Sequence, residues 1–135
     1  MREPAPVLVQ QYLESDGELR VFVVGNRTIA FRVRKLDPAQ LWVDPESVLV
    51  EQVDPPEELA DKLLELCGSW GLDVAGFDLL RVADDWVFLE VNVHCDWQWF
   101  EHRAETSEVS DAVHAWVKRR FDDLAASVAG EWSGW

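Results

Sequence analysis

The chain has 135 residues, with 12 Lys and Arg against 26 Asp and Glu, and a formal net charge of −14 at pH 7. This length is typical of one domain that buries its own core. The negative charge would repel nucleic acid and anionic membranes at long range, so neither is expected as a partner. No apolar run approaches the roughly 20 residues of a membrane span, and the N-terminus lacks a signal-peptide core, which favours a cytoplasmic location.

The first third of the chain predicts several strands. Residues 7–14 form a short apolar strand candidate, "ESDGE" breaks it, and the alternating run "LRVFVV" follows. Gly25-Asn26 then separates two alternating runs, which indicates a hairpin because both residues tolerate the positive φ of tight turns. Residues 36–47 contain two Asp-Pro pairs and are expected to form a loop before a strand at 48–53.

A helix is predicted directly after this strand. Asp54 is positioned to cap it, two prolines suit its first turn, Glu57 completes a capping-box spacing, and Gly71 is a natural stop. One face of this helix is apolar and should cover a sheet. Its members are Leu59, Leu63, Cys67 and Trp70.

The second half of the chain predicts another hairpin and a last helix. Residues 72–82 and 86–93 read as two central strands joined by "ADD". The helix should run from Ser107 or Ser110 to the "LAAS" region. The predicted fold class is therefore α+β, with a mostly antiparallel sheet covered by two main helices.

One domain should span residues 1–135, and residues 1–6 and 129–135 are the candidates for flexible ends. Cys67 and Cys95 lie in unlike settings, one in a helical pattern and one after a strand. A disulfide framework therefore has little support, and both thiols are expected to be reduced.

Three polar residues interrupt the second hairpin. Side chains alternate along a strand, so Glu90 and Asn92 point to one face, and a turn at 83–85 could bring Asp78 of the partner strand close to them. Neighbouring carboxylates repel unless one is protonated or a cation lies between them, and Mg²⁺ takes carboxylate and amide oxygens. A magnesium site is one interpretation, and a solvated polar face of the sheet is the other.

Three segments resemble, in this order, the carboxy-terminal part of ATP-grasp ligases: "VLVQQYLESDGELRVFVVGNRTIAFRVR", "GLDVAGFDLLR" and "WVFLEVN". The similarity is greatest to RimK-like glutamate ligases and microviridin-type graspetide macrocyclases. In the latter a glycine, aromatic residues and a glutamate follow the Glu-x-Asn pair, much as "DWQWFE" does here. The resemblance covers most of residues 7–120. It implies an ATP-dependent ligase that joins a carboxylate to an amine of a peptide or amino acid through an acyl-phosphate.

The resemblance implies roles at the phosphate end of such a site. Asp78, Glu90 and Asn92 match the residues that hold Mg²⁺ on the ATP phosphates. Arg20 matches the arginine of the family's Asp-x-Arg strand, and Arg34 matches the arginine at the end of the next strand. Both would neutralise phosphate or acyl-phosphate charge, because positive charge stabilises a phosphoryl group in transfer.

The nucleoside end of the site would lie in the N-terminal segment. By the resemblance, Gln11, Tyr12 and Leu13 match the hinge whose backbone receives adenine. Glu14 or Asp16 falls where the family often binds ribose. The implied cofactors are ATP and Mg²⁺.

The chain also departs from the family pattern. Glu18 stands where the strand usually begins with Asp, and residues 93–96 replace a more usual Pro, small polar residue, Gly and Gln. Residues 36–47 lack the basic, glycine-containing segment of RimK-like ligases. The family's earlier half, with its lysines and glycine-rich phosphate loop, is missing before residue 7. The resemblance therefore implies weak binding of Mg-ATP by the chain alone, and an exposed cleft face that meets the missing half or a second copy.

Two catalytic or metal-site alternatives use the cysteines. A zinc site built from Cys67, His94, Cys95 and His102 lacks the usual ligand spacing. A nucleophilic Cys95 with either histidine as its base lacks a visible activating environment. Both alternatives have weaker support than the ligase interpretation.

A non-catalytic module is the main functional alternative. In that case an ATP-grasp half would persist as a surface that binds a peptide or a subunit. Trp97, Trp99 and Phe100 would either anchor such an interface or simply pack in the core.

Overall fold

The computed structural model describes residues 9–36 and 47–132, with side chains described as far as residue 128. Its elements are, in chain order, β1 (Gly17–Val24), β2 (Arg27–Lys35), β3 (Val48–Val53), α1 (Glu57–Trp70), β4 (Val74–Val82), β5 (Asp85–Asn92), α2 (Trp97–Ala104) and α3 (Glu108–Trp132). The strands form one antiparallel sheet in the order β3-β2-β1-β4-β5. The predicted α+β class with an antiparallel sheet is confirmed.

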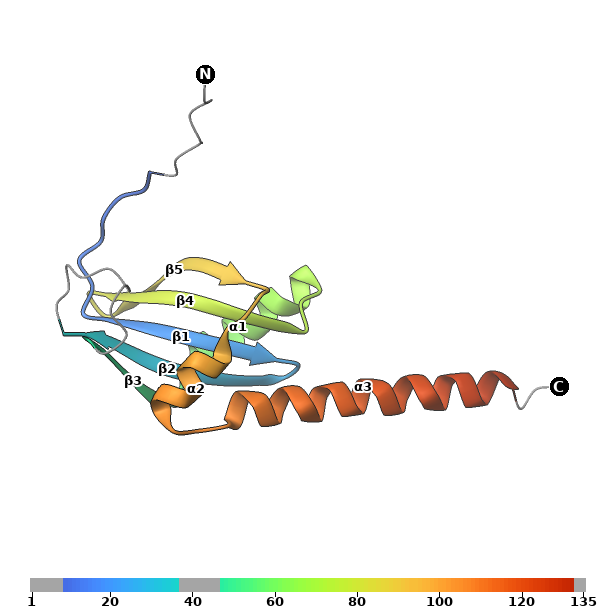
Figure 1. Ribbon diagram of the computed structural model, residues 1–135. Helices are drawn as coiled ribbons and strands as arrows, with labels where there is room; N and C mark the ends of the chain where they lie inside the picture. The colour runs from blue at the N-terminus through green and yellow to red at the C-terminus, as the bar shows by residue number, and fades with distance from the viewer. Residues whose placement is uncertain (1–8, 37–46, 133–135) are drawn as a thin grey trace, which may run out of the picture.

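The helices lie on both faces of the sheet (Figure 1). Helix α1 covers one face, and α2 with the first part of α3 covers the other. The described residues thus contain three helices where the sequence predicts two main ones. The helix that was missed is α2. It is short, and "WQWFEHRA" has no strong apolar period to mark it.

Both predicted hairpins are confirmed. Of the pair Gly25-Asn26, only Gly25 adopts a positive φ, at +61°. The turn between β4 and β5 places Ala83 and Asp84 at φ 47° and 72°. Two successive residues with positive φ fit the right-handed twist of paired strands. These turns set the strand register, and in the second hairpin a register shift between Asp78 and Leu79 then changes which side chains of β4 and β5 share a face.

Helix α1 buries Leu59, Leu63 and Cys67 against the sheet, as predicted, and ends at Gly71 with φ 66°. Two details of the prediction are wrong. The N-cap residue is Pro56, because the two prolines hold the chain extended and leave Asp54 before the cap. Trp70 is half-exposed, because it occupies the last helical position, one turn beyond the final buried residue.

The opposite face is built around aromatic side chains. Phe22, Phe31 and Phe100 lie with ring centroids 5.5–5.8 Å apart. Trp97 and Trp99 are half-buried and pack against the same cluster. Phe100 is buried, so its role is core packing. Trp97 and Trp99 bury part of their side chains in the same core. The rings of Phe22 and Phe100 lie beside Arg20, a charged residue on the same face of the sheet.

Two strand predictions are wrong. Residues 9–14, the described part of the strand predicted at 7–14, form no strand. The segment leads into β1, which already pairs with β2 and β4, so no free sheet edge lies beside it. β5 is an edge strand rather than a central one, and Phe88 and Leu89 are partly exposed there. The loop predicted at 36–47 lies almost entirely outside the described residues.

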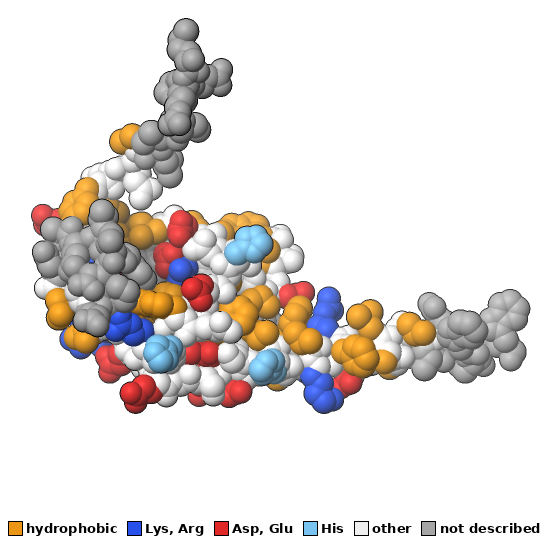
Figure 2. Space-filling view, in the orientation of Figure 1, with side chains coloured by type: hydrophobic (Ala, Val, Ile, Leu, Met, Phe, Trp, Pro, Cys, Tyr) orange, Lys and Arg blue, Asp and Glu red, His pale blue; other side chains and the backbone are white. Residues whose placement is uncertain are grey.

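Helix α3 begins at Glu108, one residue after Ser107, and runs past the predicted end at 124–127. Val109 and Ala112 in its first turns are buried on the sheet. Its later turns project beyond the sheet, with apolar side chains along them (Figure 1, Figure 2). Within the described part of the chain, no helix combines the length and the apolar character needed to span a bilayer.

Candidate functional site

The sheet face that carries α2 becomes polar at one end. The register pairs Arg20 of β1 with Asp78 of β4, and Asp78 with Glu90 of β5. Directly paired residues point to the same face of a sheet. Asn92 follows two positions after Glu90 and shares that face. Arg20, Asp78, Glu90 and Asn92 are called the Asp78 cluster below.

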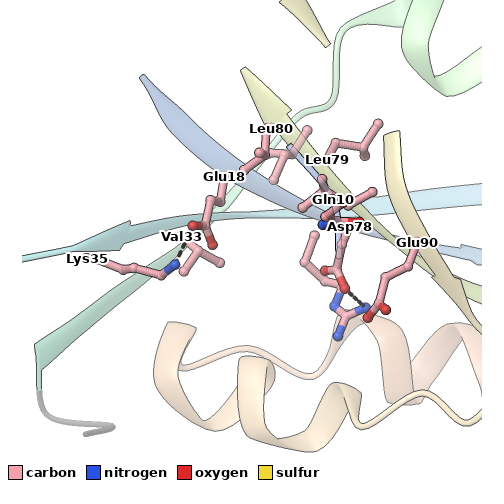
Figure 3. A pocket seen from close by; sticks show the side chains of 11 residues that line it. Gln10, Glu18, Val33, Lys35, Asp78, Leu79, Leu80 and Glu90 are labelled. Atoms are coloured by element: carbon pink, nitrogen blue, oxygen red, sulfur yellow. Dashed lines mark ion pairs between the residues drawn. The ribbon is translucent and has the colours of Figure 1, made fainter. Parts of the chain in front are cut away.

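The side chains of the Asp78 cluster are in direct contact. Nη1 of Arg20 lies 2.9 Å from Oδ2 of Asp78. The Asn92 amide donates to Oε1 of Glu90 at 2.8 Å and, at the longer distance of 3.5 Å, to Oδ2 of Asp78. The carboxylates of Asp78 and Glu90 point toward one spot (Figure 3). The sequence-based expectation that these three side chains converge is met.

Aromatic rings hold the Arg20 side chain in place, but two of its nitrogens have no hydrogen-bond acceptor in the described structure. Its guanidinium lies over the rings of Phe100 and Phe22, 5.2 and 5.8 Å from their centroids. Its Nε and Nη1 are buried and have no hydrogen-bond acceptor among the described residues. The close approach of Nη1 to Asp78 is therefore an ion pair without hydrogen-bond alignment. Buried donors without acceptors are unusual and favour a ligand that supplies oxygen atoms.

The charges of the cluster oppose one another. Burial raises the pKa of Asp78 from 3.8 to about 6; the Arg20 charge works against this shift, and the neighbouring Glu90 adds to it. Hydrogen bonds from Asn92, and then from Asp78, lower the pKa of Glu90. Near neutral pH Asp78 is thus ionised against a desolvation penalty, whereas the ionised form of the exposed Glu90 is favoured. A cation between them would relieve that penalty.

A second ion pair stands further along the same face. Nζ of Lys35 lies 2.6 Å from Oε1 of Glu18 (Figure 3). Sequence reasoning did not assign Lys35 to the site. Strand pairing could have indicated it. Val33 of β2 pairs with Glu18 of β1, and Lys35 lies two residues after Val33, so its side chain is on the same face of the sheet as Glu18.

Two adjoining hollows open over these residues. The first, of ≈520 Å³, is lined by Glu18, Arg20, Lys35, Asp78 and Glu90 among others. The second, of ≈500 Å³, shares Glu18 and Lys35 with it and extends to the N-terminal segment. A continuous groove of this size suits a ligand with both charged and apolar parts.

The residues implied for the nucleoside end are partly brought to this groove. Gln11, Tyr12, Leu13 and Asp16 line the second hollow. Glu14 is exposed and is not among its lining residues. Their roles in adenine and ribose binding stay predictions, because only their position is established.

Arg34 is not brought to the Asp78 cluster. In β2, Val33 faces Glu18, so the next residue points to the opposite face of the sheet from Arg20. Arg34 is exposed and borders the second hollow at the strand end. A role in charge neutralisation therefore stays a prediction that requires Arg34 to reach around the end of β2.

The cysteine-based alternatives gain no support. No three His, Cys, Asp or Glu side chains in the described ranges gather as a metal site. Both cysteines are free, and burial raises the pKa of Cys95, which disfavours the thiolate needed by a nucleophile. The Cys95 thiol instead donates to the carbonyl of Asn92 at 3.0 Å, which ties the following loop to the end of β5.

The Asp78 cluster fits a hard cation of the Mg²⁺ type. It offers two carboxylates and an amide oxygen, which are the ligands that such ions prefer, and leaves the remaining positions to water and phosphate. The amide of Asn92 would have to turn its oxygen toward the ion. Nε and Nη1 of Arg20, which have no hydrogen-bond acceptor in the described part of the chain, lie beside the same spot, as an anion bound to that cation would require.

This sheet with helices on both faces is the fold of ATP-grasp ligases. The ATP-grasp ligase PsnB, complexed with minimal precursor, has 25% identity and a TM-score of 0.63, covering 80% of this chain and 37% of PsnB. PsnB has also been solved with minimal precursor, Mg and ADP, at 24% identity. The macrocyclase MdnC of Microcystis aeruginosa, bound with precursor peptide MdnA, has 25% identity and a TM-score of 0.61, covering 75% of this chain and 32% of MdnC.

The chain belongs to the RimK-like ATP-grasp domain family, whose model matches residues 3–114. A probable alpha-L-glutamate ligase 2 of Shewanella frigidimarina is 30% identical over 121 residues. That match covers 85% of this chain but 39% of the relative. A second such ligase, from Shewanella denitrificans, is matched over 42% of its length. The chain thus spans about two fifths of the curated relatives.

Proposed function

We propose that this chain is the Mg-ATP-binding, carboxy-terminal portion of a carboxylate-amine ligase that acts on a peptide or amino acid. The observation that carries the proposal is the Asp78 cluster. It combines two carboxylates and an amide with an arginine whose Nε and Nη1 find no hydrogen-bond acceptor within residues 9–36 and 47–128. Membership of the RimK-like ATP-grasp family supports the same conclusion. Because the reaction consumes ATP, the proposed site of action is the cytoplasm.

Asp78, Glu90 and Asn92 would hold Mg²⁺, which would neutralise phosphate charge when bound. Arg20 would donate from Nε and Nη1 to phosphate oxygens, kept in position by Phe22 and Phe100. In the proposed reaction a substrate carboxylate attacks the γ-phosphorus of ATP and ADP leaves. An amine nitrogen then attacks the acyl carbon and phosphate leaves. The arginine charge would stabilise the phosphoryl group during its transfer.

The substrate class is proposed from the relatives. PsnB and MdnC are described with precursor peptides, and the curated relatives are probable glutamate ligases. We therefore propose that the carboxylate or the amine belongs to a peptide. The chain covers about two fifths of those relatives, so the remaining nucleotide contacts would come from outside these residues.

Calorimetry and turnover test this proposal. We expect the chain alone to bind Mg-ATP weakly, and micromolar affinity would contradict the division of contacts between two parts. In an assembly that forms ADP, Glu90→Gln and Asn92→Ala should abolish ADP formation while circular dichroism shows an intact fold. Glu51→Gln, at an exposed ion pair of β3, is the matched control and should leave turnover unchanged.

One observation favours a non-catalytic module as the second candidate. Asn92 donates to both carboxylates and Arg20 forms an ion pair with Asp78, so the two carboxylates have partners without a cation. Such a cluster could persist as a structural remnant beneath a peptide-binding or subunit-binding surface. In that case partner binding would survive both Glu90→Gln and Asn92→Ala, and no assembly would show turnover that depends on them.

A further inference from the structure

The ion pair of Glu18 and Lys35 lies where the two hollows of the groove meet. Among the described residues, these are the charged side chains that line both hollows. Nζ of Lys35 is 2.6 Å from Oε1 of Glu18, and the side chains are 20% and 22% exposed. Figure 3 shows Lys35 extending from the end of β2 toward Glu18. A ligand that extends from one hollow into the other therefore passes this pair.

The strand register separates Lys35 from Arg20 along the groove. Arg20 pairs with Phe31 of β2, and Lys35 lies four residues further along that strand, which is about 13 Å of backbone. Because this separation is an even number of residues, Lys35 and Arg20 share one face of the sheet. The side chain of Lys35 covers part of the distance when it reaches Glu18. The two cations thus line successive parts of one groove.

The charges of the first hollow leave a place for a cation beyond the Asp78 cluster. Among the described residues, its charged lining consists of three carboxylates and two cations: Glu18, Asp78, Glu90, Arg20 and Lys35. In the proposed function Mg²⁺ and Arg20 meet the phosphates beside the Asp78 cluster. The triphosphate of ATP carries more negative charge than one Mg²⁺ ion neutralises, and charged donors bind phosphate strongly. Lys35 is the cation of this lining that lies toward the nucleoside end.

We propose that Lys35 is a further nucleotide-binding residue, whose ammonium group donates to the phosphate nearest the ribose. The inference rests on the function proposed above and extends it to a residue to which the family resemblance assigns no role. Lysine suits this contact because it carries a compact charge on a flexible stem. Its ammonium group has three donors, so it can bind a phosphate oxygen while it still donates to Glu18.

Glu18 gives this contact its selectivity. Its carboxylate holds Lys35 at the groove and offsets the charge of the ammonium group, so a small free anion gains little by binding there. A phosphate that is attached to adenosine is different, because the rest of the nucleotide holds it beside Lys35 at a high effective concentration. The pair therefore favours a phosphate that belongs to a nucleotide over inorganic phosphate.

Titrations of the ¹⁵N-labelled chain with adenosine, AMP and inorganic phosphate test this role, because amide shifts detect millimolar dissociation constants. We expect Lys35→Gln to raise the dissociation constant of AMP about tenfold and to leave adenosine binding unchanged. Lys35→Arg keeps the positive charge and should retain AMP binding. Arg32→Gln, on the opposite face of β2, removes an ion pair with Glu51 and is the matched control, which should change neither ligand. Inorganic phosphate should cause no saturable shift.

The same spectra separate a failure of this inference from a failure of the proposed function. AMP binding that is unchanged in Lys35→Gln overturns the role of Lys35. Equal losses for AMP and adenosine overturn it too, since they would mean that the ion pair only ties β1 to β2. In both cases the proposed function stands if Mg-ATP still shifts the amides around Asp78. An unsubstituted chain without a saturable shift for AMP or for Mg-ATP at millimolar concentrations overturns both.

Discussion

Arg20 and Asp78 face each other at directly paired positions of β1 and β4, with Nη1 2.9 Å from Oδ2. The pairing of β1 with β4, which joins the two hairpins, brings this cation and this anion together. The pairing leaves two of the guanidinium nitrogens without hydrogen-bond acceptors while Asp78 bears an unfavourable charge. The cluster is thus prepared for a ligand that carries both a cation and oxygen atoms.

Asp78→Asn should stabilise the ligand-free chain at neutral pH. The pKa of Asp78 is raised from 3.8 to about 6, so its stabilising contribution is fully present below pH 3.8 and is lost as the pH rises through 6. The linked free energy is on the order of 2–3 kcal/mol above that pH. Denaturant unfolding at pH 5 and pH 8 should show the gain mainly at pH 8. Asp61→Asn, on an exposed turn of α1, should give no such difference.

Magnesium should raise the thermal midpoint of the chain more at pH 7.5 than at pH 5. Protons compete with the metal for Asp78 below its pKa of about 6, so the ligand set is complete only above that value. Differential scanning fluorimetry with and without millimolar MgCl₂ measures the shift. Equal shifts at both pH values, or a full shift retained in Glu90→Gln, would mean that Mg²⁺ binds elsewhere on the acidic surface.

Glu101→Gln should destabilise the fold by about 1–3 kcal/mol, because it removes a buried acceptor. The Glu101 carboxylate is 7% exposed and accepts from N and Oγ of Ser110 at 2.8 and 2.5 Å, which joins α2 to the start of α3. Chemical denaturation measures the loss. Glu108→Gln removes an exposed ion pair with Arg27 and should change stability by less than about 1 kcal/mol. Equal effects of the two changes would refute this interpretation of Glu101.

Gly25→Ala should destabilise the first hairpin, whereas Gly17→Ala should be nearly neutral. Gly25 has φ +61°, and an added Cβ would lie 3.1 Å from Cδ1 of Trp116 in α3. Gly17 has no atom of the described residues within 4 Å of an added Cβ and no positive φ. We expect a loss of about 1–2 kcal/mol at Gly25 from backbone strain alone. Thermal unfolding of both variants measures the difference.

The hairpins and helix α1 were predictable because local signals specify them. Glycine in a tight turn and alternating apolar residues fix strand pairing, and pairing fixes which side chains meet. Strand alternation and the turn at 83–85 alone would place Leu89 opposite Asp78. A register shift between Asp78 and Leu79 brings Glu90 opposite Asp78 instead, and no local signal in the sequence indicates that shift. The family resemblance added roles to these positions, which geometry alone does not assign.

The features that were missed depend on the rest of the fold. Residues 9–14 have strand-like composition, but a strand needs a neighbouring edge, and β1 leaves none beside them among the described residues. β5 is apolar like a central strand although it lies at the edge of the sheet. Arg34 was grouped with Arg20 by its place in the family pattern, yet the strand alternation turns it to the other face. Sequence spacing does not encode these neighbours.

Paramagnetic relaxation by Mn²⁺ tests the central claim most directly, because it detects weak metal binding residue by residue. In ¹⁵N-labelled chain, substoichiometric Mn²⁺ should first broaden the amide signals around Asp78, Glu90 and Asn92. Glu90→Gln should abolish this selective broadening, and excess Mg²⁺ should reverse it. Broadening spread evenly over the acidic surface, or centred away from these three residues, would contradict the cation site and the ligase function proposed from it.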